Sequence, residues 1–213
     1  MAAKRRSAPA PSRVFVLSPA TCGGVRARMV MSPAAQFALA RQLRSAEGTS
    51  LGDVFSFVSG LYFRGKLAYA EAFATPPSGL PGVYVITPSE GLRLHDEPTD
   101  LERLRRFARV DIAAADARYH GPLRRDARAL AEMLDAACEV VLLGSVATAK
   151  YVDPLAETFG DRLCFPAEFV GRGDMSRGGL LLRCVRAGRE LRYVPVAGAV
   201  RRGPRPARLG PPR

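Results

Sequence analysis

The residues best suited to chemistry in this chain lie in a polar loop, residues 18–26, that contains a thiol, two hydroxyls, two adjacent glycines and a guanidinium group. The backbone N–H groups of such a loop can hold an anion, with Arg26 closing on it. Cys22 is a candidate nucleophile. The loop lacks the GK[ST] ending of a Walker loop, and a tight turn that binds nothing explains the same residues. Its candidate ligand-binding residues are Ser18, Thr21, Gly23 and Arg26.

A second polar segment, residues 171–179, combines two arginines, one aspartate and four glycines. Glycine permits tight turns and a close approach of the backbone to a ligand. The segment is therefore interpreted as a loop that covers a ligand, with Arg172 and Asp174 as candidate contacts. A turn without a ligand is the alternative.

Two further groups of polar residues follow or interrupt apolar stretches. Ser145, with Thr148 and Lys150, stands where a helix N-terminus could bind phosphate, although a plain helix cap explains it equally well. Tyr62 and Lys66 form a polar edge on an otherwise apolar helix start. They are interpreted either as ligand contacts or as part of a solvated face.

Proton transfer and metal binding have less support in the sequence. Glu90 and Asp96 are the acids best placed for proton transfer, so Glu90 joins Cys22 as a candidate catalytic residue. The four cysteines form no CxxC pair and the chain has only two histidines. We therefore expect no metal site, no disulfide and no cofactor. No apolar run reaches membrane-spanning length, and the cysteine pattern favours a reduced, cytoplasmic setting.

The elements that must position these residues are short apolar runs at residues 14–17, 83–86, 139–143 and 162–165. Such runs predict strands buried on both faces, and helical patterns separate them. We therefore expect a three-layer α/β domain over residues 13–196, with a mostly parallel central sheet of about four to five strands and helices on both faces. The carboxyl ends of parallel strands meet at one edge, so the candidate residues should share a cleft there.

Several helix boundaries carry sequence signals. Residues 50–53 and 99–102 resemble capping boxes. Residues 54–58 fit either a helix or a strand. A helix is expected over residues 122–137, with Pro122 in its first turn, and a later one is either kinked or restarted at residues 153–154.

The formal net charge of +12 is concentrated at the two ends of the chain, because residues 1–13 and 201–213 hold nine of the twelve charges. The segments 1–12 and 197–213 are predicted to be disordered basic tails. Basic tails can hold nucleic acid through counterion release. Biased Arg, Pro and Ala usage without a function is the alternative.

Five stretches follow one another in an order that resembles a known group of proteins: residues 18–22, 60–70, 83–92, 141–151 and 169–182. They are similar to uncharacterised bacterial domains allied to the peroxide-stress protein YaaA. Those domains also resemble a domain of archaeosine synthase, which modifies a deazaguanine base in tRNA. The resemblance spans residues 14–185.

The resemblance implies a nucleotide- or nucleobase-directed protein, either a nucleic-acid base-modifying enzyme or a degenerate relative, with an anion-binding cleft at the strand ends. One departure matters: the synthase-like pattern has a catalytic lysine four residues after its cysteine, whereas this chain has Arg26 four residues after Cys22. Arginine stays protonated and cannot act as an amine nucleophile. The alternative is a non-catalytic DNA- or RNA-binding protein that acts through its basic tails and Arg-rich loops. A role beside a protein partner is a third hypothesis.

Overall fold

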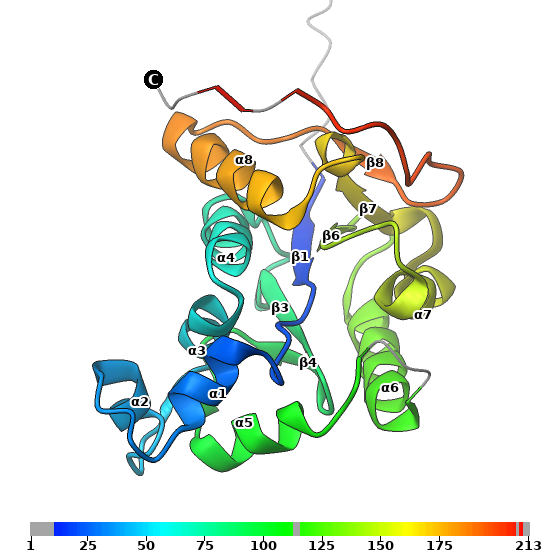
Figure 1. Cartoon of the computed structure of the whole chain (residues 1–213). Coiled ribbons are helices and arrows are strands. Elements are labelled where there is room, and N and C mark those ends of the chain that lie inside the picture. The colour runs from blue at the N-terminus through cyan, green and yellow to red at the C-terminus, as the bar shows by residue number, and fades with distance from the viewer. Residues whose placement is uncertain (1–10, 113–115, 208, 211–213) are drawn as a thin grey trace, which may run out of the picture.

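The structure is a computed structural model of the chain and describes residues 11–112, 116–207 and 209–210. Its centre is a six-stranded sheet with the strand order β4-β3-β1-β6-β7-β8 (Figure 1). The strands of this sheet are β1 (Arg13–Leu17), β3 (Val83–Thr87), β4 (Gly91–Leu94), β6 (Glu139–Leu143), β7 (Leu163–Pro166) and β8 (Tyr193–Pro195). A separate antiparallel pair joins β2 (Thr49–Ser50) to β5 (Pro98–Thr99).

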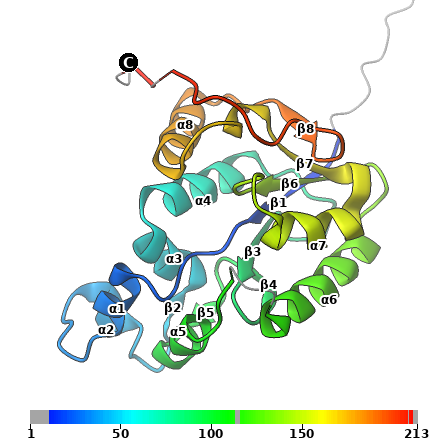
Figure 2. The ribbon, with the colours of Figure 1, turned by 45° about the vertical axis from the view of Figure 1, so that its right-hand side comes forward.

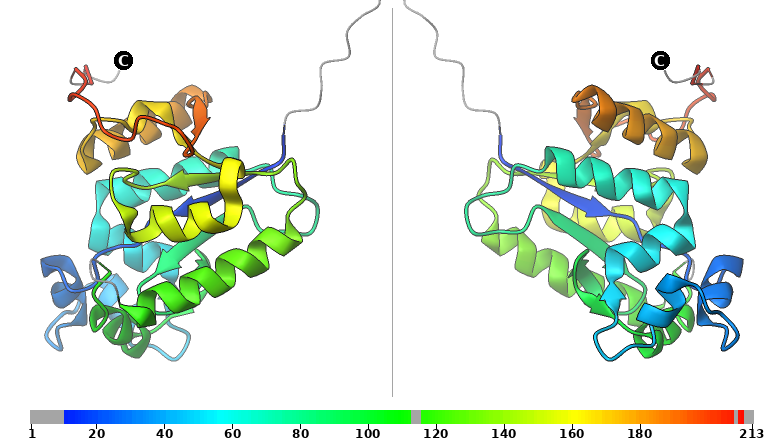
Figure 3. Two further views of the ribbon diagram at one scale, coloured as in Figure 1. Left: turned by 90° about the vertical axis from the view of Figure 1, so that its right-hand side faces the viewer. Right: turned by 90° about the vertical axis from the view of Figure 1, so that its left-hand side faces the viewer.

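Helices cover both faces of the six-stranded sheet. The helices of the described residues are α1 (Val25–Met31), α2 (Ala38–Gln42), α3 (Leu51–Ser59), α4 (Leu61–Phe73), α5 (Leu101–Ala108), α6 (Ala117–Met133), α7 (Ala149–Phe159) and α8 (Asp174–Ala187), with short 3-10 turns η1 (Gly160–Arg162) and η2 (Ala167–Phe169). In Figure 3, α6 and α7 lie in front of the sheet in one view, and α3 and α4 lie in front of it in the opposite view. The prediction of an α/β fold with a mostly parallel sheet is confirmed.

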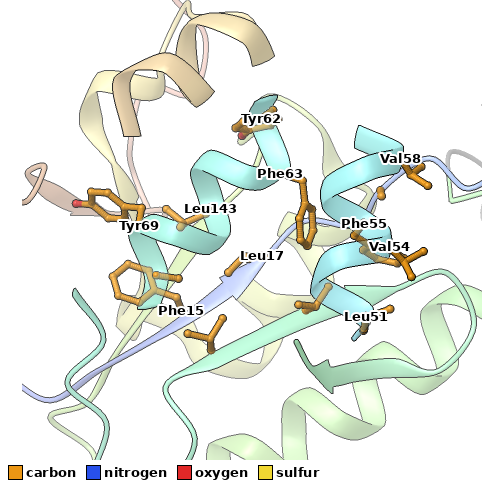
Figure 4. Packing of buried hydrophobic residues seen from close by; sticks show 14 of the residues in the cluster. Phe15, Leu17, Leu51, Val54, Phe55, Val58, Tyr62, Phe63, Tyr69 and Leu143 are labelled. Carbon is orange, nitrogen blue, oxygen red and sulfur yellow. The ribbon is translucent and has the colours of Figure 1, made fainter. Parts of the chain in front are cut away.

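The two apolar clusters of the core show why the strand sequences are continuously apolar. Phe15 and Leu17 of β1 belong to the cluster under α3, α4 and α8, whereas Val14 and Val16 belong to the cluster under α6 and α7. Successive side chains of a strand point to opposite faces, so a strand covered on both sides has no polar position. Figure 4 shows the first cluster, in which the rings of Phe15 and Tyr69 meet edge to face with centroids 5.8 Å apart.

The sheet has more strands than the sequence indicated. The four predicted strands are β1, β3, β6 and β7, and they pair in parallel. The additional strands β4 and β8 pair antiparallel at the two edges. Both are short and only partly buried, so neither has the apolar run that marks a central strand.

Two segments interpreted as loops contain helices instead. α1 begins at Val25, which places Arg26 in its first turn. α8 begins at Asp174, so the predicted loop over residues 171–179 is wrong from that residue onward. One of the glycines that suggested a loop, Gly178, serves a helix crossing: a Cβ on Gly65 of α4 would lie 2.7 Å from the carbonyl oxygen of Gly178 on α8.

The other helix predictions are resolved as follows. Ser50 caps α3 by accepting a hydrogen bond from Asp53 N at 3.0 Å, and residues 54–58 are helical. Asp100 caps α5. Helix α6 starts five residues before Pro122, and α7 runs through Pro154 without a restart.

The described residues of the C-terminal segment lie along α8 and past β8 (Figure 2). Arg202 donates a hydrogen bond to the Ala147 carbonyl at 3.3 Å, and Arg201 lies 3.9 Å from Asp153. Disorder of the two ends stays a prediction, and residues 1–10, 208 and 211–213 lie outside the described residues. None of the helices in the described ranges is both long and apolar enough to cross a lipid bilayer.

Candidate functional site

The candidate site lies where the chain changes direction across the sheet. From β1 the chain adds β3 on one side, and it then returns to add β6 on the other side of β1. The loops after β1 and β6 therefore leave the same edge of the sheet in different directions, and the crevice between them is the usual ligand position in open α/β sheets. A pocket of about 150 Å³ occupies this place.

We call this the strand-end pocket. Its walls come from the loops after β1 and β6, from the end of α3, from α4, α7 and α8, and from Ile112. Its lining residues are Ser18, Pro19, Thr21, Ser59, Tyr62, Lys66, Ile112, Ser145, Thr148, Lys150, Tyr151 and Asp174.

Close backbone packing holds the two loops together. The Ser18 N–H donates to the Leu143 carbonyl at 3.0 Å, which extends the β1–β6 ladder by one bond. A Cβ on Gly144 would lie 2.9 Å from the Ser18 Cβ and 3.1 Å from Cε2 of Tyr151, so only glycine fits there without a shift. The Ser145 N–H donates to the Tyr151 hydroxyl at 2.7 Å. Tyr151 of α7 thereby fixes the loop that follows β6.

Lys66 is the most unusual group in the strand-end pocket because its side chain is almost completely buried, at 1% exposure. Its Nζ donates to the Ser18 carbonyl at 2.6 Å and to the Ser18 Oγ at 2.8 Å. The rings of Tyr62 and Phe63 lie 4.8 and 4.7 Å from Nζ. Burial lowers the pKa of Lys66 to about 7, and the charge of Asp174 opposes this shift only in part.

A buried arginine forms the wall behind Tyr62. Arg177 of α8 donates to the Phe169 carbonyl at 3.2 Å and to Asp174 Oδ1 at 3.2 Å. Burial raises the pKa of Tyr62, and Arg177 opposes that rise. The Tyr62 hydroxyl is buried and makes no hydrogen bond of regular geometry within the described part of the chain. A ligand in the pocket can supply that missing partner.

A scan against protein-family models, a search of curated proteins and a search of solved structures each found no match for this chain.

Six of the nine predicted ligand-binding residues line the strand-end pocket. They come from the loops after β1 and β6, from α4 and from the start of α8. These six residues are Ser18, Thr21, Tyr62, Lys66, Ser145 and Asp174. Segments that are far apart in the sequence thus meet at one edge of the sheet.

Cys22 and Gly23 line a neighbouring groove of about 280 Å³, which shares Thr21 and Ile112 with the strand-end pocket and also contains Arg109. The Cys22 thiol is buried and donates to the Ala20 carbonyl at 3.6 Å. Burial raises the pKa of this thiol to about 12. Nucleophilic cysteines need the opposite environment, one that favours the thiolate, so these surroundings do not activate Cys22.

The remaining three predicted residues lie outside the strand-end pocket. Glu90 follows β3 and pairs with Arg103 at 2.7 Å, so its carboxylate is neutralised by a guanidinium group. The Arg26 guanidinium lies against Gly60, at the junction of α3 and α4. Arg172 donates to the Glu168 carbonyl at 3.0 Å and lines a separate surface pocket near α8.

Sequence reasoning missed Tyr151 and Arg177, although both shape the strand-end pocket. Tyr151 stands on a helix whose apolar residues face the core, and nothing in the local sequence marks it as a pocket residue. Arg177 was included in a glycine-rich turn. Among the described residues there is no group of three or more His, Cys, Asp or Glu side chains that could hold a metal ion.

Proposed function

We propose that this protein binds a nucleobase or nucleotide in the strand-end pocket, and that it is a nucleic-acid base-modifying enzyme or a degenerate relative of one. The observation that carries this proposal is the convergence of six polar residues from separate segments at the crevice between β1 and β6. Nucleotides bind at this place in many open α/β sheets. The resemblance of residues 14–185 to YaaA-like and archaeosine-synthase-like domains supports the same ligand class.

The chemistry of the lining suits the edge and the face of a heterocyclic base. Hydroxyls both donate and accept hydrogen bonds, and a carboxylate accepts them. Ser18, Thr21 and Ser145 supply the hydroxyls, Asp174 supplies the carboxylate, and Tyr62 supplies an aromatic ring.

The size of the pocket limits how much of a ligand enters it. Pockets for whole small-molecule ligands measure roughly 300–1,000 Å³, and the strand-end pocket measures about 150 Å³. We infer that only the base enters and that the sugar and phosphate lie in the neighbouring groove. The guanidinium group of Arg109, which lines that groove, would bind the phosphate.

Two tyrosines allow a matched test of this proposal. Tyr62 in the strand-end pocket and Tyr119 of α6, on the opposite face of the sheet, both have a buried hydroxyl that makes no hydrogen bond of regular geometry within the described ranges. Removing either hydroxyl should leave folding intact. We expect Tyr62→Phe to weaken nucleoside or nucleotide binding by about 3–10-fold, because one hydrogen bond to the ligand is lost, and Tyr119→Phe to leave binding unchanged.

The measurement is isothermal titration calorimetry of the full chain with a panel of nucleosides and nucleoside monophosphates, preceded by native mass spectrometry for a retained nucleotide. Binding of no panel member, or equal loss in both tyrosine variants, would contradict the proposal.

The second candidate function is DNA or RNA binding through the basic ends of the chain. The concentration of positive charge in these ends favours it, and Arg201, Arg202 and Arg205 are exposed. Replacing these three arginines by glutamine should lower the affinity for duplex DNA or RNA. The slope of the logarithm of the binding constant against the logarithm of the salt concentration should also become less steep, by the amount expected for about three phosphate contacts. Tyr62→Phe should leave that affinity unchanged. The reverse pattern would assign nucleic-acid contact to the pocket.

A further inference from the structure

The hydrogen-bond partners of Lys66 differ from those of most buried lysines. Buried lysines are normally paired with a carboxylate, because an isolated charge in the protein interior is costly. Both hydrogen-bond acceptors that the described residues offer to Lys66 Nζ belong to Ser18 and are uncharged. The carboxylate of the pocket, Asp174, is largely exposed and pairs with Arg177. This arrangement favours the neutral amine.

The geometry around Nζ leaves one of its positions open. An amine nitrogen has three positions beyond its carbon bond, occupied by hydrogens or by the lone pair. Ser18 takes two of them, through its carbonyl and its Oγ. The flanking rings of Tyr62 and Phe63 hold the side chain in place, and Lys66 lines the strand-end pocket. A neutral Lys66 therefore keeps its lone pair available to a ligand atom.

We propose that Lys66 is a nucleophilic amine that forms an imine with the carbonyl carbon of an aldehyde or ketone in the strand-end pocket. This inference goes beyond the proposed function, since it depends on the pocket and not on a base within it. A desolvated lysine in an apolar setting is an established way to make an amine reactive.

The reaction needs no oxidant or reductant. The Nζ lone pair attacks the carbonyl carbon, the C–N bond forms, and the carbonyl π electrons move to the oxygen. The nitrogen loses a proton and the oxygen gains one, which gives a carbinolamine. The hydroxyl then leaves as water with the remaining proton of the nitrogen, whose lone pair forms the C=N bond. The Ser18 hydroxyl, 2.8 Å from Nζ, is placed to relay these protons.

The lining of the pocket indicates the class of carbonyl compound. The volume of about 150 Å³ admits a molecule no larger than a nucleobase. Lys150 lines the same pocket, and Arg177 offsets the charge of Asp174. The surroundings are therefore net positive and suit a small carbonyl compound with an anionic group, such as a 2-oxo acid.

The small number of lysines makes the test direct, because the chain contains only Lys4, Lys66 and Lys150. The full chain is incubated with glyoxylate or pyruvate and sodium cyanoborohydride, which reduces an imine to a stable amine. Peptide mapping by mass spectrometry then locates each adduct. Lys150 is the matched control within the same pocket, and the α-amino group, with a pKa near 8 in model peptides, reports that the reagent works.

We expect Lys66 to be modified at pH 7 at least about tenfold faster than Lys150, because an ordinary lysine is almost entirely protonated at that pH. The rate at Lys66 should rise through about pH 7 and then level off. The charged or titratable groups around it are Asp174 and Arg177 from α8, Tyr62 from α4, and Lys150 and Tyr151 from α7. Lys4→Gln should leave the adduct at Lys66 in place.

Two results would overturn the proposal. One is modification of the α-amino group without modification of Lys66. The other is modification of Lys66 whose rate rises only near the pKa of an ordinary lysine. Neither result bears on nucleotide binding, which calorimetry measures separately.

Discussion

Each end of strand β1 holds a cationic side chain that is largely removed from solvent, but the two cations have different partners. At the start of the strand, Arg13 pairs with Glu139 at 2.7 Å and with Glu190 at 2.8 Å, and its guanidinium lies 4.5 Å from the ring centroid of Tyr193. At the end of the strand, the hydrogen-bond acceptors that the described residues offer to Lys66 are the uncharged oxygens of Ser18. The two cations lie at opposite ends of the same strand, Arg13–Leu17.

The pKa directions of the two groups follow from this difference. Burial lowers the pKa of Arg13, but the hydrogen bond to Glu139 and the charges of Glu190 and Glu139 outweigh it, so the pKa is raised. At Lys66, burial dominates and the pKa falls to about 7. A buried group whose pKa is strongly perturbed by desolvation is a candidate for a functional role. The start of β1 is therefore structural, and its end is the candidate for function.

The largest expected loss of stability is at the middle of the neighbouring strand β6. This loss is the reference for the smaller effects expected at the two ends of β1. Leu142 of β6 is fully buried. We expect Leu142→Ala to cost roughly 2–5 kcal/mol of unfolding free energy, because a cavity opens in the core. Urea denaturation measures this loss, with the exposed Met133→Ala as control. A mild effect at Leu142 would mean that the core lies elsewhere.

At the start of β1, we expect Arg13→Ala to cost about 1–3 kcal/mol, between the values for exposed and buried pairs, because Glu139 loses its partner at a half-buried site. The matched control is Arg124→Ala, which removes a pair at 3.0 Å with Glu157 in which the two side chains are 39% and 56% exposed. The control should show no measurable loss in the same urea experiment. Equal losses in the two variants would remove the contrast between the ends.

At the end of β1, we expect the opposite sign. Lys66→Met should raise the unfolding free energy at pH 7 by about 1–2 kcal/mol, because an unmatched buried amine is replaced by an apolar side chain. The folded-state pKa is lowered to about 7, and an unfolded lysine titrates near 10.4. Between these values the unfolded chain binds more protons.

The contribution of Lys66 to stability therefore rises from pH 7 to pH 10 in the native protein. The advantage of the Met variant should shrink over that window, as measured by urea denaturation at both pH values. Destabilisation by Lys66→Met at pH 7 would instead show that the folded protein stabilises the Lys66 side chain.

The smallest expected effect concerns uncharged hydrogen bonds near the start of β1. The Tyr69 hydroxyl lies 2.7 Å from the Tyr193 hydroxyl and accepts a hydrogen bond from Leu191 N at 2.8 Å. We expect Tyr69→Phe to cost about 0.5–1.5 kcal/mol, measured as a shift of the urea midpoint. A cost as large as that of Leu142→Ala would place the main stabilising network here.

The sequence was informative where one physical rule decides the outcome. β6 could be predicted because a strand covered on both faces must be apolar throughout, and Ser145 could be placed at the pocket because parallel strand ends share one edge. The edge strands β4 and β8 could not be predicted, because a partly exposed strand tolerates polar residues such as Arg93.

Lys66 shows where local reading of the sequence fails. Beside Arg64 it resembled part of a polar face, yet the 3.6-residue period places it in one stripe with Tyr62, Tyr69 and Ala70, all of which are buried. A lysine within an apolar stripe was thus the available signal. In α8, the same local reading took Gly178 as a sign of a loop, whereas the close crossing with α4 explains it.

That crossing has a mechanical consequence for the pocket. A Cβ on Gly178 would lie 2.8 Å from the Leu61 carbonyl oxygen and 2.9 Å from the Tyr62 Cα, so backbone rests directly on backbone. The helix that carries Asp174 and Arg177 is thereby seated against the helix that carries Tyr62 and Lys66. A methyl group at position 178 would therefore push α8 away from α4. One wall of the strand-end pocket would then move away from the Lys66 amine.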